Sequence, residues 1–262
     1  MLILTSPHNP HFKAMLQNMA RKKSRQEHQV MILEGIHLLQ MALNATPTCA
    51  IEQVFVLQTA LEKPEVQHVL AQLPAECTVY GLTAALADKL SQLATPSELI
   101  AVAKRPQAWA RQAGESAILL ENIQDPGNLG TICRAAAAAN VRHIYLSKDC
   151  VDAYAPKVLR SAMGAHFALS IVENVDAANL VQGFEGLTLV THLQATQTLF
   201  EANLSGAVCF VFGNEGQGVT PELAQLCQQA VIIPMPGVAE SLNVAMAATL
   251  CLFEQVRQKM AS

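Results

Sequence analysis

The sequence predicts an α/β protein with two domains, a smaller one at residues 1–105 and a larger one at residues 117–262. Its 262 residues exceed the roughly 100–200 residues of a typical single domain. In both parts, short apolar runs alternate with stretches of helical period, which is typical of a mainly parallel sheet with helices on both faces. Residues 106–116 fit neither period and are predicted to link the domains.

The smaller domain is predicted to contain strands separated by helices. The apolar runs that predict strands are 30–33, 54–57, 78–80 and 99–103. The segments with helical period are 36–43, 64–73 and 82–90. The linker that follows contains Trp109, which we expect to pack at the domain boundary rather than to stack on a nucleobase.

Strands and helices also alternate through the larger domain. The strand-like runs are 117–120, 143–146, 169–172, 187–193, 207–212 and 230–235. Helical patterns cover 129–140, 154–163, 221–229 and 242–259. Parallel sheets of this kind bind ligands at the loops that leave the carboxyl ends of their strands, so functional residues are expected in those loops.

Composition excludes several classes of protein. With 51% hydrophobic and 15% charged residues, the chain is too apolar to be disordered. No apolar run approaches the roughly 18 residues that span a bilayer, and the first residues lack the pattern of a secretory signal. Seven cysteines without a CxxC pair argue against a disulfide framework and a structural zinc site. We therefore expect a soluble cytoplasmic protein with no membrane partner and no metal.

Positive charge is concentrated near the N-terminus. The net charge is −4, yet residues 1–30 hold five Lys and Arg against one Glu, a net +4 that leaves −8 for the remainder. The five cations are Lys13, Arg21, Lys22, Lys23 and Arg25. Such a basic arm predicts contacts with nucleic-acid phosphates, which give salt-dependent affinity through counterion release. A solvated amphipathic helix is the alternative that charge alone leaves open.

The first informative loop is residues 122–134, NIQDPGNLGTICR, between a strand and an alanine-rich helix. Asn128 is placed to cap this helix, because its side chain can accept a hydrogen bond from the first helical turn. Gly130 and Arg134 are four residues apart and share a helix face, so the guanidinium has room to reach a ligand. The pattern indicates an anion or sugar-phosphate site; a surface arginine beside a capped helix is the alternative.

Two later loops combine glycine with polar residues. The loop 212–219, FGNEGQGV, matches neither the phosphate-loop pattern nor the dinucleotide fingerprint. Its Glu215 favours a cation, a ribose hydroxyl or a helix amide as partner. The segment IPMPGVAESLNV, from residue 233, leads into a long helix for which Ser241 is the expected N-cap, and Asn243 lies beside its free amides.

Other titratable residues give weaker signals. His143 and His192 lie in strand runs, where a structural histidine is more common than a catalytic base. Lys157, Arg160 and Ser161 form a small basic feature with the chemistry to hold a phosphate. None of these residues indicates a function by itself.

In this order and at these distances, the three loops resemble the signature motifs of the SpoU (TrmH-like) RNA 2′-O-ribose methyltransferases of the SPOUT superfamily. The motif positions are Asn122, Asp125, Pro126, Asn128, Gly130 and Arg134 in the first, 213–216 and Gly218 in the second, and 233–237 with 241–244 in the third. The resemblance covers 117–256. Residues 1–105 resemble the RNA-binding accessory domain of the two-domain ribosomal-RNA branch, which is similar to certain ribosomal proteins.

The resemblance implies a trefoil knot, in which the C-terminal segment threads through a loop of the sheet. In this family the knot binds S-adenosylmethionine. The positions carried over to cofactor binding are Gly213, Ile233 and Leu242, with Gly218, Gly237, Thr191 and His192 as further candidates. The resemblance also implies a homodimer, with the helix after the third motif in its interface.

The implied activity is methylation of a ribose 2′-hydroxyl in RNA. The implied catalytic residues are Arg134, which would activate the hydroxyl, and Asn128, Glu215, Ser241 and Asn243. Arg160 is expected to hold a phosphate of the target. The two-domain layout favours ribosomal RNA over transfer RNA as substrate. The rival interpretations are a non-catalytic RNA-binding or ribosome-assembly factor that retains the knot, and a nucleotide-dependent oxidoreductase.

Overall fold

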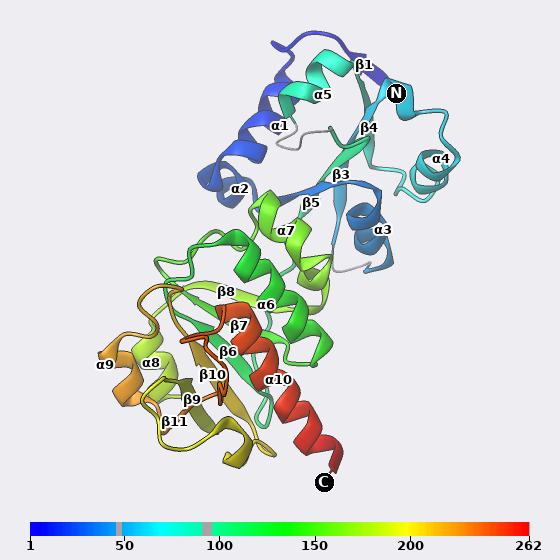
Figure 1. Ribbon diagram of the computed structural model, residues 1–262. Coiled ribbons are helices and arrows are strands. Elements are labelled where there is room, and N and C mark those ends of the chain that lie inside the picture. Colours follow the sequence, from blue (N-terminus) through cyan, green and yellow to red (C-terminus); the bar gives the residue numbers. More distant parts are fainter. Residues whose placement is uncertain (46–48, 91–95, 262) are drawn as a thin grey trace. The chain divides into compact units, whose positions relative to one another are not determined.

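The computed structural model of the protein describes residues 1–45, 49–90 and 96–261, and the chain divides into two compact units (Figure 1). Unit 1 consists of Met1–Gln107 and Tyr154–Phe167, and unit 2 of Ala108–Ala153 and Ala168–Ser262. Residues 154–163, which the alternation of elements places in the larger domain, therefore group with unit 1.

Unit 1 is built on a mixed sheet of five strands in the order β1-β4-β3-β5-β2. The strands are β1 (Leu2–Leu4), β2 (Val30–Glu34), β3 (Ile51–Leu57), β4 (Thr78–Leu82) and β5 (Leu99–Lys104). β5 runs antiparallel to β2 and β3, while β4 is parallel to β1 and β3. The strands predicted for this domain are confirmed. The edge strand β1 is additional, because three residues are too few to show a period.

Helices accompany this sheet from both segments of unit 1. They are α1 (Pro10–Ala20), α2 (Lys22–His28), α3 (Ile36–Asn44), α4 (Pro64–Leu70), α5 (Ala84–Leu90) and α7 (Pro156–Ala162). Short 3-10 turns follow β3 and α7, namely η1 (Gln58–Ala60) and η2 (Ala165–Ala168). The helices predicted at 36–43, 64–73 and 82–90 are confirmed, with ends that differ by at most three residues.

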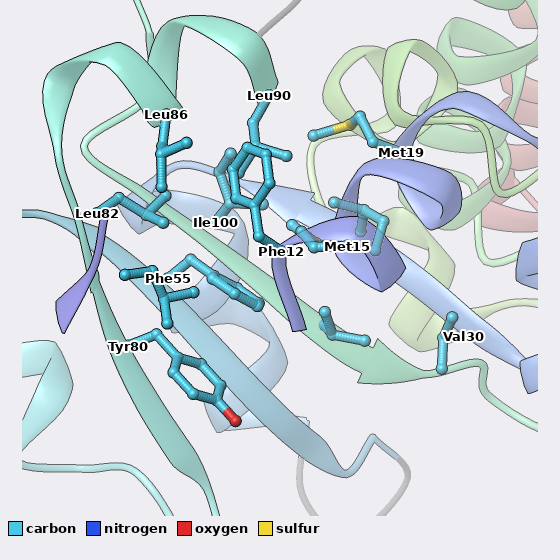
Figure 2. Close-up of a cluster of buried hydrophobic side chains, with 13 residues drawn as sticks. Phe12, Met15, Met19, Val30, Phe55, Tyr80, Leu82, Leu86, Leu90 and Ile100 are labelled. Atoms are coloured by element: carbon cyan, nitrogen blue, oxygen red, sulfur yellow. The ribbon is translucent and has the colours of Figure 1, made fainter. Parts of the chain in front are cut away.

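Helix α1 shows why residues 1–30 fold against the sheet instead of forming an extended arm. Asn9 caps the helix by accepting hydrogen bonds from two amides of the first turn, at 2.9 and 3.4 Å. Phe12, Met15 and Met19 recur at helical spacing and lie in the core of unit 1 (Figure 2). Each is at most 3% exposed, so each burial contributes about 1.5–3 kcal/mol.

The cations of this region are divided between surface and interior. Three of the five are exposed, namely Lys13, Arg21 and Lys23. Arg25 is only 4% exposed, and its Nη1 donates to the carbonyl oxygens of Asn18 and Met19 at 2.8 and 3.1 Å. Those carbonyls end α1, where the helix dipole stabilises a cation. The prediction that Arg25 contacts RNA is therefore wrong, because its guanidinium caps α1.

Arg160, predicted to hold an RNA phosphate, is instead paired with Glu34 inside unit 1. The Glu34 side chain, at the end of β2, is 1% exposed, and that of Arg160, in α7, is 24% exposed. Burial lowers the pKa of Arg160, because it disfavours the charged guanidinium. The pair joins α7 to β2 and leaves neither charge isolated in the interior. This interaction gives Arg160 a structural role, and its contact with an RNA phosphate stays a prediction.

Unit 2 is built on a fully parallel sheet of six strands in the order β11-β9-β10-β6-β7-β8 (Figure 1). The strands are β6 (Ala117–Leu120), β7 (His143–Ser147), β8 (Ser170–Val175), β9 (Leu187–Thr191), β10 (Val208–Phe212) and β11 (Gln229–Val231). β6 and β10, at the centre, are buried along their whole length, as continuous apolar runs predict. The predicted α/β class with a mainly parallel sheet is confirmed.

The helices of unit 2 are α6 (Pro126–Ala138), α8 (Ala177–Gln182), α9 (Pro221–Leu226) and α10 (Val244–Ala261), with the short turn η3 (Leu199–Glu201). α6 and α10 pack against each other, and α10 also contacts β10 (Figure 1). α8 and α9 bury Val181 and Leu223 in a cluster with β6 and β10. Within the described residues, none of the helices has the length and hydropathy to span a bilayer.

Residues 108–116, predicted as part of the linker, pack against unit 2. The amide of Trp109 donates to Ser170 Oγ at 2.9 Å, and this hydroxyl donates back to the Trp109 carbonyl at 2.8 Å. The indole meets the imidazole of His143 edge-on, with ring centroids 5.9 Å apart. His143 is buried and bonded to Glu115 at 2.8 Å. Both rings therefore have structural partners within unit 2.

Replacing Arg160 with alanine should destabilise unit 1 by about 3 kcal/mol, because the buried Glu34 carboxylate would lose its partner. The measurement is the free energy of unfolding in urea. Lys23→Ala is the control, since its 3.8 Å contact with Glu27 joins two exposed side chains and should contribute almost nothing. Equal effects of the two substitutions would contradict the buried pair.

Candidate active site

A cavity of about 700 Å³ opens at the carboxyl ends of β9, β10 and β11 in unit 2. It is lined by residues 191–194, 212–219 and 240–244, with Ile232, Ile233, Met235 and Ala247. This volume is within the roughly 300–1,000 Å³ that is usual for small-molecule sites. The cavity therefore has the size of a ligand pocket.

The topology of the sheet explains why the cavity forms here. After β6 the chain turns to one side and builds β7 and β8, whereas after β10 it turns to the other side and builds β11. Parallel α/β sheets bind ligands at such a reversal, where loops separate above the carboxyl ends of neighbouring strands. The loops after β6, β10 and β11 are the three that the sequence patterns single out.

The loop after β10 is closed on itself. A Cβ at Gly213 would lie 2.1 Å from the carbonyl carbon of Gly218, so only glycine fits there. Gly218 has a φ of 73°, a left-handed value that favours glycine. Asn214 Oδ1 accepts hydrogen bonds from two loop amides at 2.8 and 3.2 Å, and the Asn214 carbonyl accepts another from Gly218 at 2.8 Å. These contacts hold the loop backbone along the cavity.

Three polar side chains join the three loops. Glu215 Oε1 accepts a hydrogen bond from Asn128 Nδ2 at 3.0 Å, and Asn128 Oδ1 accepts one from Asn243 Nδ2 at 2.9 Å. Glu215 also accepts hydrogen bonds from the amides of Asp125 at 3.1 Å and Gln124 at 3.4 Å. One carboxylate therefore holds the first loop against the second, and Asn128 extends the link to the third.

These contacts keep the Glu215 carboxyl ionised. Burial alone would raise its pKa, but hydrogen bonds from Asn128 and from backbone amides outweigh burial and hold the pKa below the usual value of glutamate. The lowered pKa means that the network is fully formed above the ordinary pKa of about 4.3. The network is lost only as the pH falls through the lowered pKa of Glu215.

Two predicted helix caps are wrong. Asp125, not Asn128, caps α6, and its Oδ1 accepts from the amide of Asn128 at 2.9 Å. α10 begins at Val244, and Asn243 Oδ1 accepts from two amides of its first turn at 2.9 and 3.4 Å. Asn243 thus takes the place expected for Ser241. The change at α6 leaves the side chain of Asn128 free to link the loops.

Arg134 lies exposed on α6, six residues after Asn128 and therefore about 9 Å further along the helix axis. Within the part of the chain that the structure describes, its side chain has no hydrogen-bonding or ion-pair partner. Glu215, expected to orient it or to bind a hydroxyl, contacts the first loop instead. The guanidinium is therefore available to a ligand.

Most residues predicted to bind the cofactor lie in the cavity wall, namely Thr191, His192, Gly213, Gly218, Ile233 and Leu242. Ser241, Asn243 and Glu215 line the same cavity. Three predicted site residues are not among the described residues that line the cavity, namely Gly237, Asn128 and Arg134. Asn128 still reaches the wall through its two hydrogen bonds.

The cavity wall is acidic. Glu215 and Glu240 are its acidic residues, and neither lysine nor arginine occurs among the lining residues that the structure describes. A concave wall of one sign of charge raises the local concentration of oppositely charged ligands. The wall therefore favours a cation over a phosphate.

Two residues that organise the site have no individual role predicted from the sequence, Asn214 of the second motif and Gln124. Asn214 Nδ2 donates to the carbonyl of Asn122 at 3.0 Å, and Gln124 Nε2 donates to that of Asp149 at 2.6 Å. The available signal for Asn214 is its place among glycines, where asparagine bonds the nearby backbone. Gln124 Nε2 also donates to Asn122 Oδ1 at 2.5 Å, but its contact with Asp149 joins residues 25 positions apart and has no local signal.

The seven cysteines are free thiols, and their environments argue against a thiolate nucleophile. Burial raises the pKa of four of them to about 12. Burial raises the pKa of Cys77 and Cys227 to about 11. Such thiols are protonated at neutral pH. Among the described residues, no group of three or more His, Cys, Asp and Glu side chains is arranged to hold a metal ion.

Comparison with protein-family models places residues 115–253 in the SpoU rRNA Methylase family. This match spans more than half of the chain and includes all three loops of the site. The chain belongs to the SpoU rRNA methylase family. A second model, described as the MRM3-like substrate binding domain, matches residues 9–101 of this SpoU protein.

Individual relatives agree with the SpoU assignment. An uncharacterized tRNA/rRNA methyltransferase of Synechocystis sp. is 35% identical over 99% of this chain and 95% of its own length. The 23S rRNA (guanosine(2553)-2′-O)-methyltransferase RlmP of Bacillus subtilis is 31% identical over 88% of this chain and 90% of its own length. An AdoMet-bound rRNA methyltransferase from Sinorhizobium meliloti has a TM-score of 0.84, 28% identity and 97% coverage of both chains.

Replacing Gly213 with alanine should open the loop after β10, because the added Cβ would collide with the Gly218 backbone. We expect amide hydrogen exchange in residues 214–219 to become at least about tenfold faster, as measured by mass spectrometry. Gly237→Ala is the control, since nothing lies within 4 Å of a Cβ at that position. Unchanged exchange in the Gly213 variant would rule out the closed geometry.

Proposed function

We propose that this SpoU protein is an enzyme that methylates a ribose 2′-hydroxyl in ribosomal RNA, with S-adenosylmethionine as methyl donor. The observation that carries the proposal is the link from Glu215 through Asn128 to Asn243, which gathers the three motif loops beside one cavity. The relatives support it: the Bacillus protein is named as a 23S rRNA guanosine 2′-O-methyltransferase, and the Sinorhizobium structure contains AdoMet.

S-adenosylmethionine fits the cavity in size and in charge. When bound, its sulfonium supplies a methyl group that is already activated for nucleophilic attack. The carboxylates of Glu215 and Glu240 favour that cation, and the glycine loop allows close approach of backbone to ligand. We assign contacts with the adenosine moiety to Gly213, Ile233 and Leu242, with Thr191, His192 and Gly218 as further wall residues.

The protein must place the ribose in line and stabilise its oxygen. In-line placement can lower a barrier by about 7–11 kcal/mol. Arg134 supplies the positive charge, because its guanidinium is exposed and has no partner among the described residues. An arginine pKa above about 12 makes proton abstraction costly, so Arg134 stabilises the developing alkoxide and the adjacent phosphate while the proton passes to solvent.

The remaining polar residues hold the site in position. Glu215 fixes Asn128 and not Arg134, which revises the role expected from the resemblance. Asn243 bonds Asn128 from the start of α10, and Ser241 lies beside it in the cavity wall. We assign these residues to orientation of the ribose and the cofactor, since a stably ionised Glu215 has no proton to give.

Unit 1 is the part that we assign to RNA binding. Most of it matches a family model described as a substrate binding domain. The exposed residues Lys13, Arg21 and Lys23, with the half-buried Lys22, give residues 1–30 a net positive charge, whereas the rest of the chain is net negative. Ribosomal RNA is favoured over transfer RNA because RlmP, which aligns with 88% of this chain, is named for 23S rRNA.

We also propose a homodimer through α10. Its exposed apolar side chains recur at spacings of four and three residues, in Met246, Leu250 and Phe253, and each is 42–55% exposed. A continuous apolar stripe of this kind favours contact with protein over contact with water. A second copy of the chain is the partner that the SpoU resemblance implies. The trefoil knot and a cytoplasmic location are proposed on the same resemblance.

Replacing Arg134 with alanine should lower kcat for methylation by about a hundredfold or more, because one stabilising charge is lost in the transition state. Affinity for S-adenosylmethionine should change little, since Arg134 is outside the described cavity wall. The measurements are transfer of labelled methyl groups to ribosomal RNA and calorimetric titration of the cofactor.

Arg142→Ala is the control, because this exposed arginine precedes β7 at the amino end of the sheet and its 3.0 Å ion pair is with Glu115, which is not among the described cavity residues. Equal losses in the two variants would show that the effect is not specific to Arg134. Absence of 2′-O-methylation of ribosomal RNA by the wild-type protein would refute the proposed function. Methyl transfer to tRNA instead would change the proposed substrate to tRNA.

The double substitution Leu250→Glu and Phe253→Glu should convert the dimer to a monomer, because it places like charges opposite one another across an apolar interface. Sedimentation velocity measures the change. Leu226→Glu on α9 is the control, since this leucine is also exposed, at 36%, but lies on another helix. A wild-type protein that sediments as a monomer would contradict the proposal.

A further inference from the structure

Glu121 contacts both ends of the glycine loop without lining the cavity. Its amide donates to the carbonyl of Phe212, the last residue of β10, at 2.9 Å. Its carboxylate accepts hydrogen bonds from the amide of Thr220 at 2.7 Å and from the Thr220 hydroxyl at 2.8 Å. Phe212 precedes the loop and Thr220 follows it, so one residue holds both ends.

We propose that Glu121 is a positioning residue that sets the spacing of the loop ends and thereby the affinity for S-adenosylmethionine. This inference rests on the proposed function of the cavity. Glu121 is not among the described residues that line the cavity. It therefore affects the ligand through the position of the loop and not by direct contact. The three signature motifs do not include it, because it precedes the first of them.

The loop transmits any movement of Thr220 to the cavity wall. Gly218 and Val219 line the cavity and directly precede Thr220. Their backbone atoms are packed against Gly213, where a Cβ would lie only 2.1–2.2 Å from them. A shift at Thr220 therefore separates the two sides of the loop at the point where they touch.

The geometry at Thr220 favours a carboxylate. One oxygen of Glu121 receives the amide proton and the other receives the hydroxyl proton. The Thr220 hydroxyl also accepts from the amide of Leu223 at 3.4 Å, so its own proton is directed toward Glu121. A glutamine would place an NH2 group against one of these donors, and it would lose the charge that strengthens both bonds.

The test compares Glu121→Gln with Asp176→Asn. Asp176 is a matched control in the same unit, because it caps α8 by accepting from the amide and the side chain of Asn179, each at 3.0 Å. We expect Glu121→Gln to weaken binding of S-adenosylmethionine about tenfold by calorimetry and to raise its KM in parallel, with kcat within about twofold of wild type.

The control Asp176→Asn should bind S-adenosylmethionine with wild-type affinity. This should hold even if its melting temperature falls as much as that of Glu121→Gln. Two substitutions at the partner sharpen the comparison. Thr220→Val should reproduce the loss of affinity, while Thr220→Ser, which retains the hydroxyl, should not. Combining Glu121→Gln with Thr220→Val should add little, because both changes act on the contact between these two residues.

The inference and the proposed function can fail separately. If wild type binds S-adenosylmethionine and Glu121→Gln binds it equally well, the role of Glu121 is overturned while the function stands. If wild type does not bind it, the function is refuted, and hydrogen exchange in the ligand-free protein decides the positioning role. Faster exchange of the amides of 213–220 in Glu121→Gln supports that role, and unchanged exchange overturns it.

Discussion

A single carboxylate, that of Glu215, holds the candidate site together. It accepts hydrogen bonds from one side chain and two backbone amides of the first loop, and through Asn128 it is linked to the start of α10. A general acid or base that works at neutral pH needs a pKa near 7, whereas these bonds move the pKa of Glu215 downward. The charge therefore serves to position the loops, and Arg134 remains for the chemistry.

Much of the larger domain could be predicted because its signals are local. Strands β6 and β10 are buried on both faces, so their sequences are continuous apolar runs that stand out from the surrounding helices. Ligands bind at the carboxyl ends of parallel strands, and this rule predicts that the three polar loops lie at one edge of the sheet. Individual cavity residues such as Gly213 and Leu242 are predicted by the resemblance to SpoU enzymes and not by this rule.

The errors arise where only the folded chain brings a partner close, or where two residues compete for one role. Arg25 is predicted to bind RNA from its residue type, but the carbonyls of Asn18 and Met19 reach its guanidinium only when α1 and α2 pack together. Asp125 and Asn128 are both good helix caps, and the proline after Asp125 favours the earlier one, because proline is preferred in the first turn. Composition does not show which of two cations is buried.

The distribution of charge provides separate surfaces for two ligands of opposite charge. S-adenosylmethionine carries a sulfonium cation and RNA is an anion, so a wall that attracts one repels the other. The cavity carries Glu215 and Glu240, and Arg134 lies outside it on the exposed side of α6. The cations proposed to bind RNA are in unit 1. A net charge of −4 is therefore compatible with binding RNA, because affinity depends on the few cations that meet phosphates and not on the total.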